Sequence, residues 1–233
     1  KLLDNCESLG SKYQHKESSS NALMSSFSTF FSHHISTMEG GVITTNNLEL
    51  YHILLSLRAH GWTRNLPNEN EVTGTKNPDP FIESFNFVLP GFNVRPMELS
   101  GAIGIEQLKK FDDLLLMRRK NAELFVEMFK DIKGIKIQRE IGESSWFGFS
   151  IILTSEFKKT RTEALKELAL AGVDTRPIVA GNFVRNPVIK YFDYKVHGKL
   201  TNSDNLHKNG FFVGNHHYDL KNELSLLKST LLK

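Results

Sequence analysis

The sequence predicts an α/β fold, and three observations support this expectation. Segments rich in β-branched residues alternate with segments whose apolar residues recur at the 3.6-residue period of a helix. The chain has 233 residues, enough to enclose a sizeable hydrophobic core. Hydrophobic residues make up 39% and charged residues 24% of the chain, which is typical of globular proteins. No apolar run approaches the ~20 residues that a membrane-spanning helix needs, so we expect no membrane association.

The first ninety residues contain one clear strand and one clear helix. Residues 40–45, Gly-Gly-Val-Ile-Thr-Thr, predict a strand after a glycine pair, and residues 48–59 have helical periodicity. Residues 62–90 are rich in Asn, Pro, Glu and Gly, so we expect a long loop without a helix. This succession places short strands and a helix before an irregular connection.

The second part of the chain is more regular. Residues 96–129 predict one long helix or two consecutive helices, because apolar side chains recur among paired charges. The remaining expected elements are strands at 134–138 and 147–153, a helix at 161–171 that ends at a glycine, and a terminal helix at 220–232. These elements predict a second, smaller α/β unit.

Charge and cysteine content exclude several classes of protein. The formal net charge is only +3, and the basic residues are spread along the chain, so no nucleic-acid-binding surface is expected. Cys6 is the only cysteine. A single cysteine excludes an internal disulfide, a four-cysteine zinc site and a four-cysteine iron–sulfur cluster within this sequence. We expect a protein of the reducing cytoplasm, without a metal.

Two carboxylates near the start of the chain could form part of a site. Asp4 and Glu7 follow an apolar segment that would end a strand, and the carboxyl ends of strands are where α/β proteins bind ligands. The same spacing also fits a helix N-cap with a capping-box partner. The residues alone leave both interpretations open.

A second group of polar residues precedes the predicted strand at 40–45. Ser28 lies among hydroxyl residues that alternate with phenylalanines, and His33 and His34 follow before Glu39-Gly40-Gly41. Hydroxyls, imidazoles and a glycine pair suit phosphate binding and acid–base chemistry, although these residues alone favour a structural hydrogen-bonding role for the histidines. Adjacent histidines in a strand would point to opposite faces, which disfavours a zinc site. No lysine occurs between Glu17 and Thr75.

Several motifs in this order and spacing resemble a known family. They are Asp4-x-x-Glu7, Ser28, the residue five positions later, Glu39-Gly40-Gly41, Arg58-Ala59-His60-Gly61, and Gly91-Phe92-Asn93-Val94-Arg95-Pro96-Met97-Glu98-Leu99. The pattern is similar to that of the DegT/DnrJ/EryC1/StrS sugar aminotransferases over nearly the whole chain. The resemblance implies the α/β architecture of fold-type I pyridoxal-phosphate-dependent transferases, which is like that of aspartate aminotransferase.

The resemblance also implies a domain organisation. Residues 1–95 would be the C-terminal part of the large cofactor-binding domain, and residues 96–233 a connecting helix and the small C-terminal domain. We expect the N-terminal part of the large domain to precede Lys1, since a fold-type I subunit needs further strands and phosphate-binding backbone there.

Four residues match cofactor-binding positions of the family. Asp4 matches the acid at the pyridine nitrogen, which keeps the ring protonated and makes it an electron sink. Glu7 matches the position beside the ring hydroxyl, and Ser28 matches a phosphate ligand. Asn93 matches a phosphate contact supplied by the neighbouring subunit, which implies a homodimer with shared active sites.

The family's Schiff-base lysine is replaced here by His33, because the spacing from Asp4 and from Glu39 places His33 rather than His34 at that position. This difference, with the segment Arg176–Asn182, resembles the subgroup of sugar 3-dehydratases. Pyridoxal 5'-phosphate and pyridoxamine 5'-phosphate would then bind non-covalently, with L-glutamate as amino donor and His33 as the catalytic acid and base.

The single cysteine favours the branch of this subgroup that lacks an iron–sulfur cluster. That branch acts on GDP-linked 4-keto-6-deoxy-D-mannose and removes the C3 hydroxyl, a step towards colitose in bacterial O-antigen and lipopolysaccharide biosynthesis. We expect four residues to contact the substrates: His60, Arg95, Asp174 and Arg176. For the two arginines the reason is that guanidinium groups bind carboxylates and phosphates in bidentate fashion. A core histidine and ion pairs are the alternatives for these four residues.

Two other functions stay open. An ordinary amino-sugar-forming aminotransferase could take its Schiff-base lysine from elsewhere, such as Lys12, Lys16 or Lys76. A degenerate homologue could bind a ligand without catalysis. The presence of Asp4, Glu7 and Ser28 argues against the degenerate homologue, since a decayed site has no reason to keep them.

Overall fold

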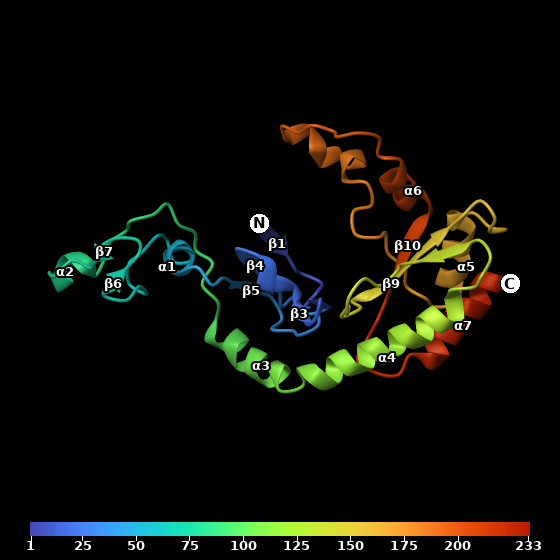
Figure 1. Cartoon of the computed structure of the whole chain (residues 1–233), viewed down its shortest axis with the longest axis horizontal. Coiled ribbons are helices and arrows are strands. Elements are labelled where there is room, and N and C mark those ends of the chain that lie inside the picture. The colour runs from blue at the N-terminus through green and yellow to red at the C-terminus, as the bar shows by residue number, and fades with distance from the viewer. The chain divides into compact units, whose positions relative to one another are not determined.

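A computed structural model describes all 233 residues, which form two compact units, Lys1–Phe111 and Asp112–Lys233 (Figure 1). Strands and helices are present in both units, as the sequence predicts. The predicted domain boundary between residues 95 and 96 lies one helix earlier than this division. The assignment of the units to a large cofactor-binding domain and a small domain stays a prediction.

A three-stranded sheet with the order β1-β4-β5 organises the first unit. Strand β1 (Leu2–Asp4) runs parallel to β4 (Met24–Ser28), with Asp4 opposite Ser26, and β5 (Gly41–Thr44) pairs antiparallel with β4. Because β1 and β4 are adjacent and parallel, their carboxyl ends lie at the same edge of the sheet. The residues that follow the two strands are therefore neighbours in space although they are distant in sequence.

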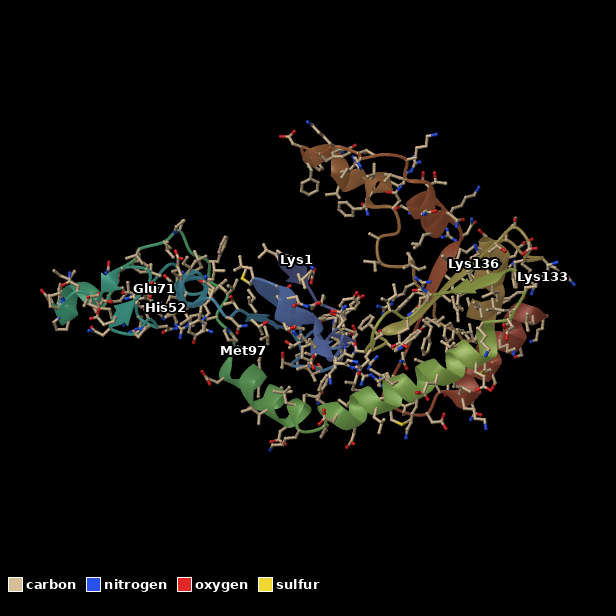
Figure 2. The ribbon with its side chains drawn as sticks, in the orientation of Figure 1. Lys1, His52, Glu71, Met97, Lys133 and Lys136 are labelled. Atoms are coloured by element: carbon tan, nitrogen blue, oxygen red, sulfur yellow. The ribbon has the colours of Figure 1, made fainter.

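The helix predicted at 48–59 is observed as α1 (Leu48–Leu57). Asn47 begins this helix, because its side-chain oxygen accepts a hydrogen bond from the backbone N–H of Leu50 at 2.8 Å. His52 is buried on α1, and its Nδ1 accepts a hydrogen bond from the backbone N–H of Glu71 at 3.1 Å (Figure 2). This bond attaches the following loop to the helix.

The loop predicted at 62–90 contains more structure than the sequence indicates. The prediction that it has no helix is wrong by one turn: α2 (Pro80–Glu83) begins where Asp79 caps the N–H of Phe81 and Pro80 supplies a helical first position. The buried Trp62 stacks on Phe85 and Phe87. Two short hairpins and a 3-10 turn complete the first unit: β2 (Lys12–Tyr13) with β3 (Lys16–Glu17), β6 (Glu69–Asn70) with β7 (Gly74–Thr75), and η1 (Ser18–Asn21).

The segment 96–129 forms two consecutive helices, α3 (Glu98–Leu108) and α4 (Phe111–Phe129), which is one of the two predicted arrangements. Helix α3 belongs to the first unit. The side-chain oxygen of Gln107 accepts a hydrogen bond from the backbone N–H of Ser36 at 3.4 Å. A Cβ added at Gly104 would lie 3.2 Å from the side chain of Thr37, so glycine allows α3 to approach this segment closely.

The second unit is built around an antiparallel sheet with the order β10-β9-β8. Its strands are β8 (Ile135–Ile137), β9 (Gly148–Leu153) and β10 (Gly210–Gly214). Helices α4, α5 (Arg161–Leu170) and α7 (Lys221–Leu232) contribute side chains to the core. Stacked rings of Phe125, Phe129 and Phe149, all 0% exposed, form its centre. The sequence predicts every one of these elements except β10.

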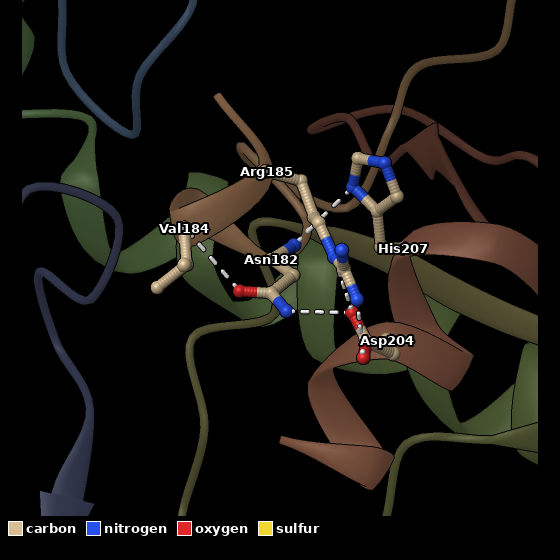
Figure 3. Close-up of polar contacts among 5 residues, drawn as sticks. All are labelled: Asn182, Val184, Arg185, Asp204 and His207. Atoms are coloured by element: carbon tan, nitrogen blue, oxygen red, sulfur yellow. Dashed lines mark hydrogen bonds and ion pairs between the residues drawn. The ribbon is translucent and has the colours of Figure 1, made fainter. Parts of the chain in front are cut away.

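The connection between α5 and β10 is held by a polar cluster that we call the Asp204 anchor, formed by Asn182, Arg185, Asp204 and His207. Asp204, in α6 (Thr201–Asn209), accepts hydrogen bonds from Asn182 Nδ2 at 2.7 Å and from Arg185 Nε and Nη2 at 2.9 and 3.0 Å (Figure 3). His207 Nδ1 accepts from the backbone N–H of Asn182 at 3.3 Å. Two 3-10 turns, η2 (Phe183–Arg185) and η3 (Pro187–Tyr191), follow Asn182.

No helix of this structure combines the length and the apolar character that crossing a membrane requires.

The Asp204 anchor predicts a pH-dependent opening of residues 182–185. The hydrogen bonds from Arg185 and Asn182 lower the pKa of the Asp204 carboxyl from 3.8 to about 2. A carboxyl whose pKa is lower in the folded state stabilises that state above its ordinary pKa, and the contribution is lost as pH falls towards 2. We expect the hydrogen-exchange protection factors of the Asn182 and Val184 amides to fall by about two- to fivefold between pH 5 and pH 2.5, since the ion pair is exposed.

Replacement Asp204→Asn should produce the same loss of protection already at pH 6. Asp193→Asn, in an exposed loop, is the matched control and should change nothing. Unchanged protection at Asn182 and Val184 in Asp204→Asn would show that the cluster does not anchor this segment.

Candidate active site

The residues that follow β1 and β4 meet at one edge of the first sheet. Asp4 ends β1 and Ser28 ends β4, and their strands are adjacent and parallel. Cys6 follows Asp4 by two residues, and His33 follows Ser28 by five. The Sγ of Cys6 lies 3.3 Å from Nε2 of His33, and the Oγ of Ser28 lies 3.5 Å from Nδ1 of the same ring. The structure thus brings together three of the predicted site residues and the single cysteine.

Asp4 presents a carboxylate with one oxygen occupied. Its Oδ1 accepts hydrogen bonds from the backbone N–H of Cys6 at 3.1 Å and from the hydroxyl of Ser26 at 3.3 Å, and no protein group bonds to Oδ2. The carboxylate is exposed. Asp4 therefore has an acceptor oxygen available to a ligand that carries an N–H group.

The alternative interpretation of Asp4 and Glu7 as a helix cap is wrong. Residues 5–10 form turns, with the backbone N–H of Ser8 bonded to the carbonyl of Asn5, and they lead into β2 rather than into a helix. Glu7 is exposed in this turn, one residue from Cys6. The predicted cofactor-binding role of Glu7 stays a prediction.

His33 lies in a short turn that its own backbone helps to close. Its N–H donates to the carbonyl of Phe30 at 2.9 Å, and the N–H of Phe30 donates to Ser28 Oγ at 3.1 Å. The ring of Phe30 meets the imidazole edge-on at 6.0 Å. His33 is half-buried, whereas His34 is 5% exposed. The side chain of His33, rather than that of His34, therefore faces Ser28 and Cys6.

A pair of threonine hydroxyls closes the turn that carries both histidines. Thr29 Oγ1 and Thr37 Oγ1 lie 2.6 Å apart, and the N–H of Thr29 donates to the carbonyl of Gly40 at 3.0 Å. Gly40 has φ +140°, and a Cβ there would lie 2.9 Å from Thr29 Oγ1. The glycine of the Glu39-Gly40-Gly41 motif is thus required by backbone geometry and close packing.

Cys6 is the site residue that the sequence analysis did not identify. Burial raises the pKa of its thiol above the ordinary value of 9.0, a hydrogen bond with Ser28 opposes this effect, and the negative charges of Asp4 and Glu7 add to it. The thiol therefore stays protonated at neutral pH and offers an S–H donor. Only the three-dimensional pairing of β1 with β4 reveals its contact with His33.

Three further predicted site residues lie in the first unit without a hydrogen bond to the His33 cluster. His60 has φ +65°, is exposed, and donates its backbone N–H to Phe92 at 2.8 Å. Asn93 is exposed and bridges to Ala59 through the backbone, and Arg95 is exposed. His60 and Asn93 thus belong to two adjacent backbone segments, and the core-histidine alternative for His60 is wrong.

Glycines explain why these two segments lie so close together. A Cβ added at Gly91 would lie 2.0 Å from the backbone nitrogen of Gly61, and one added at Gly61 would lie 1.6 Å from the carbonyl oxygen of Leu89. Gly61 also has φ +80°. Larger residues at either position would separate the segment of His60 from that of Asn93.

Asp174 and Arg176 lie in the second unit and are both exposed. The backbone of Arg176 exchanges two hydrogen bonds with Phe212 of β10, at 2.9 and 2.8 Å, which fixes this residue beside the sheet. No ion pair involves Arg95, Asp174 or Arg176 within its own unit, so nothing in either unit supports the alternative of a surface ion pair.

Two of the three lysines considered as alternative Schiff-base residues have partners of their own. Lys12 pairs with Glu17 at 3.9 Å across the β2–β3 hairpin, and Lys76 Nζ donates to the carbonyl of Arg64 at 3.4 Å. Lys16 is exposed on β3. None of the three forms a hydrogen bond with the residues around His33.

Comparison with known proteins places the chain in a family. The sequence pattern of the DegT/DnrJ/EryC1/StrS aminotransferase family matches residues 2–224. A relative from Yersinia pseudotuberculosis, GDP-4-keto-6-deoxy-D-mannose 3-dehydratase, is 55% identical over 233 residues, which is 100% of this chain and 59% of that protein. This chain therefore spans about 59% of the length of that relative.

Solved structures give the same result. The Escherichia coli GDP-4-keto-6-deoxy-D-mannose-3-dehydratase with bound hydrated PLP is 55% identical, has a TM-score of 0.96, and is matched over 99% of this chain and 59% of that one. A variant of such an enzyme, with histidine replaced by lysine and the preceding serine by asparagine, is 53% identical with a TM-score of 0.93 over 96% of this chain and 59% of that one.

Two more structures of this enzyme, each 54% identical to the present chain, hold a trapped PLP-glutamate geminal diamine and, in a histidine-to-asparagine mutant, GDP-perosamine. These similarities confirm the predicted α/β fold of the fold-type I pyridoxal-phosphate-dependent transferases. The chain belongs to the DegT/DnrJ/EryC1/StrS aminotransferase family.

Proposed function

We propose that this chain is part of a GDP-4-keto-6-deoxy-D-mannose 3-dehydratase, which removes the C3 hydroxyl of its sugar with L-glutamate as amino donor. The observation that carries the proposal is His33, a histidine that faces Ser28 and lies at the edge of the sheet next to Asp4. The identity of 55% with an enzyme of this name over the whole chain supports it.

The identity of the key histidine has independent support. In the solved variant, the exchanged histidine directly follows an exchanged serine. In this chain only His33 follows a serine, Ser32, because His34 follows His33. This order supports matching the serine–histidine pair of the relative to Ser32-His33, and with it the proposal that His33 takes the place of the lysine.

The residues at the edge of the sheet fit pyridoxal phosphate. The unbonded Oδ2 of Asp4 suits a protonated ring nitrogen, and the hydroxyl of Ser28 suits a phosphate oxygen. Glu7 would lie beside the ring hydroxyl, and Asn93 would complete the phosphate site of a second subunit in a homodimer. When bound, pyridoxal phosphate supplies an electron sink and carries the amino group that glutamate donates.

His33 would act as the only proton carrier of the reaction. Imidazole takes and gives protons near neutral pH, so His33 can remove a proton from the carbon next to the ring and give a proton to the departing C3 hydroxyl. Imidazole forms no stable Schiff base with an aldehyde. The cofactor would therefore be held non-covalently, and the side chain at position 33 offers no primary amine that could release the product as an amino sugar.

The remaining candidate residues are proposed to bind the two substrates. The guanidinium groups of Arg95 and Arg176 suit the carboxylates of glutamate or the diphosphate of GDP, and His60 and Asp174 offer polar groups for the sugar. In the overall reaction, glutamate becomes 2-oxoglutarate, the sugar loses one oxygen, and ammonia is released. The product is a GDP-linked 4-keto-3,6-dideoxy sugar, which we assign to cytoplasmic colitose synthesis for O-antigen.

The function is tested by the mass of the sugar product. The full-length protein is incubated with GDP-4-keto-6-deoxymannose, glutamate and pyridoxal phosphate, and the nucleotide sugar is analysed by mass spectrometry. We expect the loss of one oxygen atom without gain of nitrogen, with equimolar 2-oxoglutarate and ammonia. An amino sugar that keeps its oxygen would show an aminotransferase, and an unchanged sugar would show a binding protein.

Replacement His33→Asn should abolish deoxygenation while the protein still binds its cofactor. Loss of a general acid–base group costs about 10²- to 10⁴-fold in rate. We expect kcat to fall by at least ~10²-fold and cofactor affinity to change by less than about threefold. His197→Asn, an exposed loop histidine, is the matched control and should keep full activity. Activity close to wild type in His33→Asn would remove His33 from the mechanism.

Replacement Asp4→Asn tests the cofactor site separately. The amide keeps the shape of Asp4 but removes the charge that would hold a protonated ring nitrogen. A hydrogen bond to a charged group contributes about 1.5–3 kcal/mol, so cofactor affinity should fall by roughly 10- to 100-fold in absorbance titrations. Asp193→Asn is the control. Unchanged affinity in Asp4→Asn would show that Asp4 does not contact the cofactor.

A further inference from the structure

The imidazole of His33 has a hydroxyl on one nitrogen and a thiol on the other. Ser28 Oγ lies 3.5 Å from Nδ1 and Cys6 Sγ lies 3.3 Å from Nε2. Cys6 follows β1 and Ser28 ends β4, so the two side chains reach the ring from adjacent strands. We propose that Ser28 and Cys6 are positioning residues that hold His33 as the tautomer with hydrogen on Nδ1 and the lone pair on Nε2. The functional consequence rests on the proposed function.

The hydrogen-bonding capacity of Ser28 indicates which nitrogen carries the hydrogen. Its Oγ already accepts a hydrogen bond from the backbone N–H of Phe30 at 3.1 Å. A second lone pair can accept the Nδ1–H of His33, and the hydroxyl hydrogen then stays available to Cys6 or to an anionic ligand. In the opposite tautomer, the only hydroxyl hydrogen of Ser28 would have to be donated to Nδ1, so Ser28 could not donate a hydrogen bond to an anion.

Cys6 favours the same tautomer from the other side of the ring. Burial raises the pKa of its thiol, so the group is protonated at neutral pH. A thiol is a weak donor and a weak acceptor, and the lone pair of Nε2 is a strong acceptor. The contact is therefore better satisfied by S–H donating to Nε2 than by an Nε2–H directed at sulfur.

The arrangement gives His33 the form that a general base requires. The basic lone pair is located on Nε2, at the end of the ring away from the backbone. The Nδ1–H is occupied by Ser28, at the carboxyl end of β4. When the hydroxyl of Ser28 donates its hydrogen to a ligand, its oxygen becomes a stronger hydrogen-bond acceptor for Nδ1–H. Ligand binding would therefore stabilise the same tautomer. Phosphate binding and the protonation state of the base would thus be coupled through one side chain.

The tautomer can be measured without cofactor or substrate. The ¹⁵N resonances of the His33 ring, assigned by their absence in His33→Asn, distinguish a protonated from an unprotonated nitrogen. In the wild-type full-length protein at pH 8.5 we expect Nε2 to be the unprotonated nitrogen. Ser28→Ala should lower the ratio of the Nδ1–H to the Nε2–H tautomer at least threefold, and Cys6→Ala should lower it by a smaller factor.

Conservative variants separate positioning from folding. Ser28→Thr and Cys6→Ser each keep a hydroxyl donor and should preserve the wild-type ratio. Ser20→Ala, which removes an exposed hydroxyl bonded to the carbonyl of Glu17, should also preserve it. In the kinetic assay, Cys6→Ala should lower kcat about three- to tenfold and leave the KM for glutamate within about twofold, because Cys6 acts through His33.

The proposal is overturned if the wild-type protein has its hydrogen on Nε2, or if neither alanine variant changes the ratio. Should Ser28→Ala fail to fold, Cys6→Ala and Cys6→Ser decide the question, since Cys6 lies in a turn. The proposed function fails in a different way: if the wild-type protein does not deoxygenate the sugar, the tautomer ratios still decide whether Ser28 and Cys6 position His33.

Discussion

The parallel pairing of β1 with β4 is the interaction on which the site depends. It places Asp4 opposite Ser26 and brings two turns, one after each strand, to the same edge of the sheet. Asp4 and Cys6 come from the first turn, and Ser28 and His33 come from the second. A shift of this register by one residue would turn Asp4 to the other face of the sheet. The carboxylate, the hydroxyl and the imidazole could then no longer serve one ligand.

The chemistry follows from one side chain at this edge. Lysine and histidine both move protons, but only a primary amine forms a stable covalent Schiff base. In the function proposed above, His33 would keep the proton transfer without the covalent attachment, so the sugar would lose a hydroxyl rather than gain an amino group. The neighbours of His33 fit this role. Ser28 and Cys6, whose side chains are uncharged, contact its two nitrogens.

Sequence reasoning identifies those parts that local patterns determine. The helix at Leu48–Leu57 is predicted because Asn47 caps an apolar period, and β5 because β-branched residues follow a glycine pair. The turn α2 is missed because its Pro80 reads as a loop residue, and β10 because its segment Gly210–Gly214 has no alternating polar residues. These two elements depend on local capping and on pairing with β9, a partner distant in sequence.

The candidate site likewise contains residues that sequence motifs identify and one residue that only the strand pairing reveals. Asp4, Ser28 and His33 are identified by the order and spacing of motifs, and the structure brings them together. From the sequence, Cys6 is informative only as the single cysteine. Its contact with His33 depends on strand pairing between segments 27 positions apart. The interpretation of Asp4 and Glu7 as a helix cap is wrong because the chain after β1 forms turns that lead into the β2–β3 hairpin.

The most direct test of the account is covalent trapping of pyridoxal phosphate. The full-length protein is loaded with the cofactor, treated with borohydride, and its mass is measured. The account predicts no added mass for the wild type and one reduced cofactor on the protein for His33→Lys, attached at position 33. A reduced cofactor on a lysine of the wild-type protein, such as Lys12, Lys16 or Lys76, would contradict it.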